Sequence, residues 1–243
     1  MTGGYMGKLL FVDLTSGTIR EESPDETFYR NYVGGYGIGA RILYDRMKAG
    51  VDPLGPDNIL GMVTGPLTGS PAIGGARYQA VGKSPLTGGW GDANSGGFFG
   101  PSLKFAGYDG VFFTGIADKP VYLLIEDGRA EIKDASHLWG KETYETEDTL
   151  QAEHGAGARV ICIGPAGEKQ SLVSCIITHK GDAAGRSGMG AVMGSKKLKA
   201  VVARGTKKVP FHDEEEAKRL RQNQIEDLKS SGFLERYRRH RHA

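Results

Sequence analysis

Charged and amide side chains stand among an unusual number of glycines in residues 66–110, which read PLTGSPAIGGARYQAVGKSPLTGGWGDANSGGFFGPSLKFAGYDG. Arg77 follows a Gly-Gly-Ala run, and Asn94 comes two residues before the pair Gly96 and Gly97. Glycine lets a backbone approach a ligand closely, and the arginine fork of donors suits phosphate oxygens and electron-rich cofactor atoms. The stretch therefore predicts a ligand cradle. A surface arginine and an asparagine in a turn would explain the same two side chains.

A second stretch of small residues, DAAGRSGMG at residues 182–190, comes directly before a predicted helix. Backbone N–H groups at such a helix start form a site for anions. A tight junction between a loop and a helix would require the same small residues, and the stretch does not match the GxxxxGK[ST] phosphate loop. It is a candidate anion site whose ligand the residues alone leave open.

The remaining candidates for chemistry are weaker. Cys162 and Cys175 belong to no C-x-x-C pair, so both are predicted to be small buried residues in separate strands, with no disulfide, zinc or iron–sulfur role. The histidines are scattered and form no H-x-x-x-H metal pair. The GGYGIG run at residues 34–39 follows a predicted helix instead of a strand, which argues against a dinucleotide site.

Composition and charge bound the possible functions. The chain has 243 residues, of which 38 are glycine, and its net charge is +2. A nearly neutral chain has no overall attraction to nucleic acid or to an anionic membrane. No apolar run approaches the ~20 residues that span a bilayer, and the N-terminus lacks a signal pattern. We expect a cytoplasmic globular protein with no nucleic-acid or membrane partner.

Hydrophobic periodicity and turn residues predict short strands with peripheral helices. Strands are expected at residues 8–13, 18–21, 58–64, 77–82, 110–115, 121–126, 130–133, 159–163, 171–178 and 200–204. Helices are expected at residues 23–32, 40–47, 101–106, 141–154, 188–198 and 213–228, with residues 90–97 irregular and residues 164–167 in a turn. Because the strands cluster in pairs with few crossover helices, the expected fold class is α+β, with mainly antiparallel twisted β-sheets. A first domain is expected at residues 1–210 and the start of a truncated helical second domain at residues 211–243.

The order of these motifs resembles the N-terminal domain of the aldehyde:ferredoxin oxidoreductase family, whose members are tungsten or molybdenum bis-pterin enzymes. The resemblance rests on residues 4–17, 32–45, 66–110 and 179–201. It implies a fold of two twisted sheets related by pseudo-symmetry. The sequence itself shows no clear internal repeat.

The resemblance also implies roles in the first stretch. Arg77 would contact the pterin cofactor and lie between it and a 4Fe–4S cluster. Asn94 would supply a backbone carbonyl to a magnesium ion that joins the two pterin phosphates, and Gly96 and Gly97 would lie against the pterin.

In the second stretch, the resemblance implies that Ala183, Ala184, Gly185 and Arg186 bind the second pterin and its phosphate. A carbonyl from Ala183 or Ala184 would complete the magnesium site, and the residues alone do not decide which. Asp182 stands where some family members have a basic residue, so no phosphate contact is expected of it.

The activity implied by the resemblance is the oxidation of a small aldehyde to a carboxylic acid, with ferredoxin or an iron–sulfur electron-transfer subunit as partner. The choice between tungsten and molybdenum, the catalytic acid and base, and a homodimer all stay open. Two alternatives are a relative that reduces aromatic acyl-CoA esters and a non-catalytic fragment that binds or assembles the cofactor. The cysteine ligands of the cluster are not in this sequence, and residues 236–243 depart from the family, so we hypothesise a truncated, frameshifted or split gene product.

Overall fold

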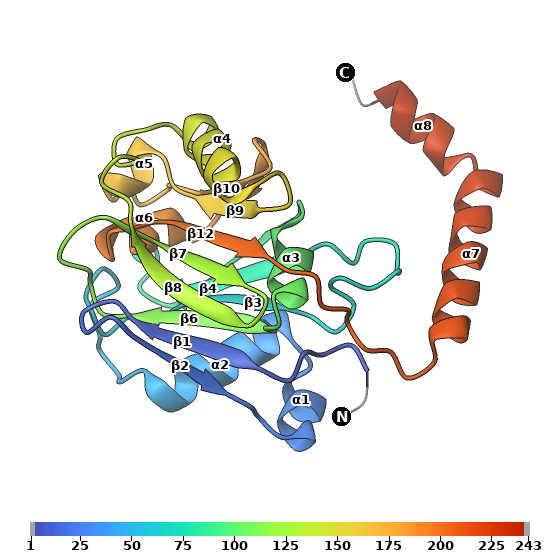
Figure 1. Cartoon of the computed structure of the whole chain (residues 1–243), viewed down its shortest axis with the longest axis horizontal. Helices are drawn as coiled ribbons and strands as arrows, with labels where there is room; N and C mark the ends of the chain where they lie inside the picture. Colours follow the sequence, from blue (N-terminus) through green and yellow to red (C-terminus); the bar gives the residue numbers. More distant parts are fainter. Residues whose placement is uncertain (1–2, 241–243) are drawn as a thin grey trace.

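The computed structural model describes residues 3–240, without the side chains of Leu234 and of residues 238–240, and it places the strands in two six-stranded sheets (Figure 1). Residues 241–243, where the predicted departure from the family ends, lie outside the described part. The first sheet, with the order β2-β1-β6-β3-β4-β5, contains β1 (Leu9–Asp13), β2 (Thr18–Glu22), β3 (Leu60–Thr64), β4 (Tyr78–Lys83), β5 (Trp90–Ser95) and β6 (Gly110–Thr114). The second sheet, with the order β11-β10-β9-β12-β7-β8, contains β7 (Val121–Glu126), β8 (Arg129–Asp134), β9 (Arg159–Cys162), β10 (Ile176–Thr178), β11 (Asp182–Ala184) and β12 (Leu198–Arg204).

Helices cover the sheets and fill the space between them. They are α1 (Glu26–Tyr32), α2 (Gly35–Arg46), α3 (Phe99–Phe105), α4 (Thr143–His154), α5 (Pro165–Glu168), α6 (Met189–Ser195), α7 (Glu214–Ser230) and α8 (Phe233–His240). Alternation along each strand sends one set of side chains inward and the next outward. The inward set from both sheets forms one core, which includes Leu10, Met62, Phe113, Leu123 and Val201. The outward sets pack beneath α1 and α2 on the first sheet and beneath α4 on the second.

The two sheets have the same connectivity. Each begins with a hairpin, β1–β2 or β7–β8, and each closes its first strand against its last strand in a parallel pair, β1–β6 or β7–β12. The other neighbouring strands are antiparallel. The prediction of an α+β fold with mainly antiparallel sheets is therefore confirmed, and the pseudo-symmetry appears in the strand order.

Several predicted elements were wrong. Residues 90–97 were expected to be irregular, yet β5 pairs with β4 along all six of its residues. The strand expected at residues 171–178 is reduced to β10, because the amide of Ser174 bonds to the carbonyl of Ser171 at 2.9 Å and closes a turn there. The turn at residues 164–167 is the start of α5, and the helix expected to reach residue 198 ends at Ser195, before β12.

Helices α7 and α8 form an arm that stands away from the two sheets (Figure 1). No residue of α7 is buried. The connecting residues 205–212 do pack on the body, where Val209 is 4% exposed and the amide of Gly4 donates to the carbonyl of Pro210. Within residues 3–240, none of the helices has the length and apolar character needed to span a membrane.

Candidate functional site

The predicted site residues come together where the edge strands of the two sheets meet. Strand β5 ends the first sheet and β11 ends the second, and the two strands contact each other. The loop after β5 contains Gly96 and Gly97, and the loop after β11 contains Gly185 and Arg186. The two stretches that the sequence separates by about 90 residues thus form one site.

Arg77, directly before β4, is exposed and holds Asn94 on the neighbouring strand. Its Nε donates to the side-chain oxygen of Asn94, and its Nη2 donates to the backbone carbonyl of Asn94 at 3.3 Å. Among the described residues, no carboxylate forms an ion pair with Arg77. The guanidinium charge is therefore held in place by neutral groups and stays available to an anion.

A buried amide fixes this pair. Gln79 is 2% exposed; its Oε1 accepts from Asn94 Nδ2 at 2.9 Å, and its Nε2 donates to Asp92 Oδ2 at 3.0 Å. The register Gln79↔Asn94 of the β4–β5 pair makes both contacts possible. Sequence reasoning did not single out Gln79, because one polar residue in an alternating strand ordinarily faces solvent.

Gly96 and Gly97 lie against the second half of the molecule. Gly97 has φ +77°, and a Cβ there would come within 3.0 Å of the Thr178 methyl group. A Cβ on Gly96 would lie 3.4 Å from Asp182 Oδ1 and 3.5 Å from Arg77 Nη1. Gly97 is therefore required by the backbone, whereas Gly96 leaves the space between a carboxylate and a guanidinium open.

Residues 183–186, at the end of β11 and the start of the second loop, are exposed apart from Ala184. Ala183, Gly185 and Arg186 are exposed, whereas Ala184 is fully buried in the core between the sheets. Arg186 forms no ion pair with any carboxylate of residues 3–240. The loop therefore presents backbone and one cation to the surface.

The pairing of the strands relates the two halves of the site residue by residue. In the first sheet, one row of paired residues reads Gly110, Val63, Gln79, Asn94. In the second sheet, the corresponding row reads Ala200, Cys162, Ile177, Ala183. Asn94 and Ala183 thus hold equivalent places at the ends of the two rows. A second pair of contacts agrees, because a Cβ on Gly100 would meet the Arg77 carbonyl at 3.0 Å and one on Gly190 would meet the Cys175 carbonyl at 2.7 Å.

A cavity of about 270 Å³ opens beside Arg77 and Asn94. The start of α2, at Gly34, Gly35 and Tyr36, forms its other wall. No side chain caps this helix start, so the positive end of the helix dipole lies at the wall of the cavity. The GGYGIG run, set aside as a dinucleotide site, contributes to this anion-favouring pocket instead. Tyr36 of this run is 51% exposed.

A buried ion pair fixes the turn that begins the cradle. Lys104 donates to the carbonyls of Gly65, at 2.6 Å, and Gly4, and its Nζ lies 3.7 Å from Asp109 Oδ1. Asp109 also accepts the backbone amide of Gly7 at 2.7 Å. Burial lowers the pKa of Lys104 to about 8 and raises the pKa of Asp109. The N-terminal segment and the cradle turn are thereby tied to one buried lysine.

The two cysteines differ from the prediction in one respect. Cys162 is buried in β9, and burial raises the pKa of its thiol to about 12. Cys175 is only partly buried and lies before β10, outside the strands. In residues 3–240, no group of three His, Cys, Asp or Glu side chains is placed to hold a metal ion.

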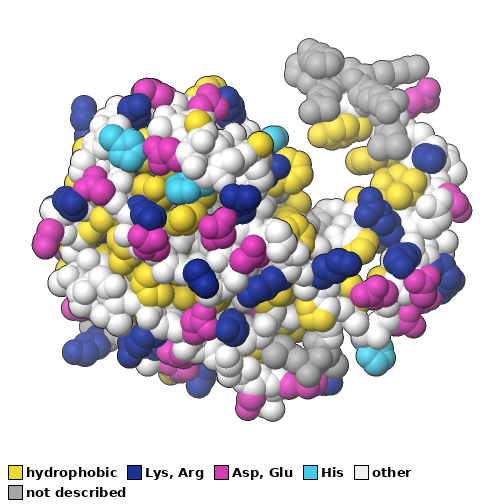
Figure 2. Space-filling view, in the orientation of Figure 1, with side chains coloured by type: hydrophobic (Ala, Val, Ile, Leu, Met, Phe, Trp, Pro, Cys, Tyr) yellow, Lys and Arg dark blue, Asp and Glu magenta, His cyan; other side chains and the backbone are white. Residues whose placement is uncertain are grey.

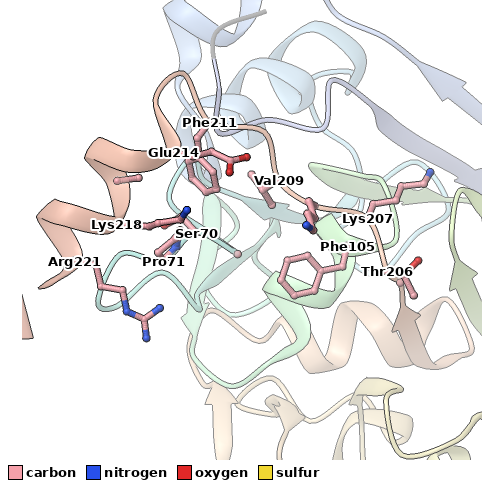
Figure 3. Close-up of a pocket in the computed structure, with 14 residues that line it drawn as sticks. Ser70, Pro71, Phe105, Thr206, Lys207, Val209, Phe211, Glu214, Lys218 and Arg221 are labelled. Atoms are coloured by element: carbon pink, nitrogen blue, oxygen red, sulfur yellow. The ribbon is translucent and has the colours of Figure 1, made fainter.

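A larger cavity, of about 490 Å³, lies between the start of α7 and the body (Figure 3). Its wall combines Phe105, Val209 and Phe211 with Lys218 and Arg221 of α7. None of the predicted site residues lines it. The site at the β5–β11 junction and this cavity are therefore separate features.

Comparison with known proteins gives one consistent family. Residues 9–205 match the sequence model of the aldehyde ferredoxin oxidoreductase N-terminal domain. The tungsten-containing aldehyde ferredoxin oxidoreductase of Pyrococcus abyssi is 47% identical over 239 residues, which are 96% of this chain and 39% of that protein. The WOR-like subunit of an aliphatic sulfonate oxidoreductase from Pyrococcus furiosus is 39% identical, over 89% of this chain and 37% of that protein.

A solved structure, the active-site complex BamBC of benzoyl coenzyme A reductase with 1,5-dienoyl-CoA, superposes with a TM-score of 0.92. It is 40% identical and covers 95% of this chain and 35% of that chain. The chain thus spans well under half the length of the relatives that it matches.

Proposed function

Because the chain belongs to the aldehyde ferredoxin oxidoreductase family, we propose that it is the cofactor-binding part of an enzyme that oxidises aldehydes to carboxylic acids. The observation that supports this most directly is the junction of β5 and β11. There Asn94 of β5, which Arg77 holds, and Ala183 of β11 lie in equivalent places on two edge strands that contact each other. Two equivalent loops suit a cofactor made of two pterins.

The residues present fit such a group. Arg77 has no carboxylate partner among the described residues, and the uncapped start of α2 adds backbone donors beside it. Both would bind the anionic parts of a pterin. Gly96 and Gly185 leave backbone accessible next to them, and Arg186 adds a second cation. When bound, the tungsten or molybdenum pterin supplies the redox chemistry, and this chain binds and orients it.

The magnesium ion is proposed at the backbone carbonyls of Asn94 and Ala183. Carbonyl oxygens and phosphates are the ligands that magnesium prefers. The equivalence of these two residues in the strand pairing favours Ala183 over Ala184. The full burial of the Ala184 side chain agrees with this choice.

We propose further that the electrons leave through a 4Fe–4S cluster to ferredoxin or an iron–sulfur subunit. The cluster would be held by polypeptide that corresponds to the remainder of the relatives. Two free cysteines agree with a reducing, cytoplasmic compartment. A homodimer is compatible with this scheme.

A second candidate keeps the scaffold and changes the substrate to an aromatic acyl-CoA ester. The likeness to the benzoyl coenzyme A reductase complex favours it. The substrate contacts that would separate the two activities are not among the site residues described above.

The test measures tungsten, molybdenum, magnesium and iron, together with pterin fluorescence after oxidative release, in protein purified anaerobically from its source. The wild-type chain is expected to retain pterin with tungsten or molybdenum. Arg77→Ala should retain at least about tenfold less, which is the effect of losing one charged hydrogen bond. Arg129→Ala, in the exposed hairpin strand β8, is the matched control and should match the wild type. Equal pterin in both variants would contradict the role of Arg77, and the absence of pterin from every sample would favour a chain that holds the cofactor only together with other polypeptide.

A further inference from the structure

The loop after β11 is held by the hairpin of the opposite half. Ser187 Oγ donates to the backbone carbonyl of Asp92 in β5 at 2.9 Å. In return, the carbonyl of Ser187 accepts from Ser84 Oγ, in the β4–β5 turn, at 2.9 Å. Ser84 is fully buried. Two hydrogen bonds therefore cross between the halves at one residue.

The backbone of Ser187 is strained. Its φ of +63° lies in the left-handed region, which a residue with a Cβ adopts at a cost. The conformation persists because the two cross-half hydrogen bonds fix both the hydroxyl and the carbonyl. One residue, Ser187, combines the strained backbone with both hydrogen bonds. This combination indicates that the conformation of the loop after β11 is required.

The next residues of the loop are also fitted to the opposite hairpin. Met189 begins α6 and rests on the paired glycines Gly82 and Gly91. A Cβ on Gly91 would lie 2.6 Å from the Met189 methyl group, and one on Gly82 would lie 3.4 Å from its sulfur. The absence of a side chain at Gly91 lets the end of the Met189 side chain lie directly on the hairpin.

The reverse contact is made by the loop after β5. The rings of Phe98 and of His179, in the β10–β11 turn, meet edge to face with centroids 5.0 Å apart. Arg159 of β9 lies over the same ring at 5.2 Å. Gly97 packs against Thr178. Each candidate cofactor loop thus packs against the hairpin of the other half.

We propose that Ser187 is a positioning residue that couples the two cofactor loops, so that a ligand ordering one loop also orders the other. Asp92, its acceptor, lies two residues before Asn94, and Ser187 lies four residues after Ala183. The hydrogen bond therefore joins the two segments that carry these backbone carbonyls. The inference rests on the proposed function only for the identity of the ligand, since the coupling is a property of the chain itself.

The test is amide hydrogen exchange on the full chain with Ser187→Gly. Glycine accepts the positive φ, so the variant removes the hydroxyl while relieving the strain, and the melting temperature should stay within about 2 °C. Exchange should rise about fivefold or more in residues 90–98 of the opposite half as well as in residues 182–188. Ser187→Ala, which keeps the Cβ, should change exchange in the same direction.

Ser195→Ala is the control, because the Ser195 hydroxyl bonds only to Val192 of its own helix among the described residues. It should leave residues 90–98 unchanged. Unchanged exchange there in both Ser187 variants would overturn the coupling.

The amounts of pterin and magnesium that the variants retain after anaerobic purification distinguish a positioning role of Ser187 from a role in packing alone. Ser187→Gly is expected to lose most of both at an unchanged melting temperature, and full retention with raised exchange would overturn the positioning role. Raised exchange with no pterin in any sample, wild type included, would support the coupling and count against the proposed function instead.

Discussion

Two buried tyrosines show how much a single hydroxyl matters in this core. Tyr78 is 1% exposed, and its hydroxyl makes no hydrogen bond of good geometry within residues 3–240, although the Ser95 hydroxyl lies near it. The single hydrogen of the Tyr108 hydroxyl lies within reach of two acceptors, the Glu21 carboxylate and, at 3.0 Å, the carbonyl of Gly128. Tyr78→Phe should therefore leave the free energy of unfolding unchanged or raise it, whereas Tyr108→Phe should lower it by about 1–2 kcal/mol. Urea unfolding of both variants measures this, and an equal loss would show that Tyr78 has a partner.

Two buried lysines predict an unusual dependence of stability on pH. Burial lowers the pKa of both Lys104 and Lys196 to about 8. The unfolded chain therefore binds more protons than the folded chain between about pH 8 and the ordinary lysine pKa of roughly 10.4, so stability rises with pH across that window. Burial raises the pKa of the Cys162 thiol to about 12, so above about pH 9 this one group opposes the two lysines and reduces the rise in stability, which reverses only above the ordinary lysine pKa of roughly 10.4.

Lys196→Met tests this. The Lys196 ammonium contacts the carbonyls of Gly115, at 3.1 Å, and Pro56, at 3.4 Å, and its nearest charges are Asp57 and Asp13. Methionine removes the charge without stranding a paired carboxylate. The rise in unfolding free energy from about pH 8 to about pH 9 should shrink by about 1 kcal/mol. Lys229→Met, on the exposed face of α7, should preserve the rise, and a variant of Lys196 that also preserved it would contradict the assignment.

At this scale the sequence picked out candidate side chains that the fold brings together, but not the residues that support them. Arg77, Asn94 and the glycines stand out by type and spacing, because their neighbours are small. Gln79 and Ser187 do not stand out, since each matters only through a register and a cross-half contact. The register and the cross-half contact depend on which strands become neighbours, and the residue types alone do not determine the strand order.

At the scale of elements, the β10–β11 hairpin is held by a buried carboxylate of α4. Glu147 is 4% exposed, and its Oε2 accepts the amide of Lys180 at 3.0 Å. His179 and Lys180 both have left-handed φ values, of +48° and +55°. Glu147→Ala should free this turn and lower the free energy of unfolding by about 1–3 kcal/mol. Glu145→Ala, an exposed position on the same helix, should cost less than about 0.5 kcal/mol by thermal unfolding, and similar losses would contradict the anchoring.

The hairpin with an explicit Asp-Gly turn was predictable, whereas the hairpin whose second strand is β5 was not. The Asp127–Gly128 turn was expected, and both residues adopt positive φ, of +44° and +93°. Strand β5 was missed because Trp90–Ser95 contains glycine, aspartate and asparagine, which have low strand propensity. It forms because β4 offers an unpaired edge and Gln79 bonds to two of its side chains.

At the scale of the whole molecule, the two halves share a topology that their sequences hide. Equivalent positions such as Val63 and Cys162, or Gln79 and Ile177, need only agree in the face to which they point. Alternation satisfies that requirement with many residue types. Pseudo-symmetry is therefore visible in strand order and not in residue identity. It brings the two loops to one junction without any repeated motif.

The arm of α7 and α8 predicts how this body behaves when shortened. Leu220, Phe233 and Tyr237 of the arm are each about half exposed, and Figure 2 shows apolar side chains on the arm beside a gap that separates it from the body. By contrast, the connecting segment that includes Val209 is packed. A chain ending at His212 should therefore unfold within about 2 °C of the full chain, since α7 buries no residue.

A chain ending at Arg204 is the matched comparison. It also loses Val209 and the bond from Gly4 to Pro210, so its melting temperature should fall by about 4 °C or more. Calorimetry of the three chains decides between a body that is stable by itself and one that depends on the arm. If the chain ending at His212 already melts as early as the chain ending at Arg204, the arm stabilises the two sheets despite its exposure. The proposed boundary near residue 210 is then misplaced. If only the chain ending at Arg204 melts at a lower temperature, the arm is free to pack against other polypeptide while the candidate cofactor loops stay in place on the body.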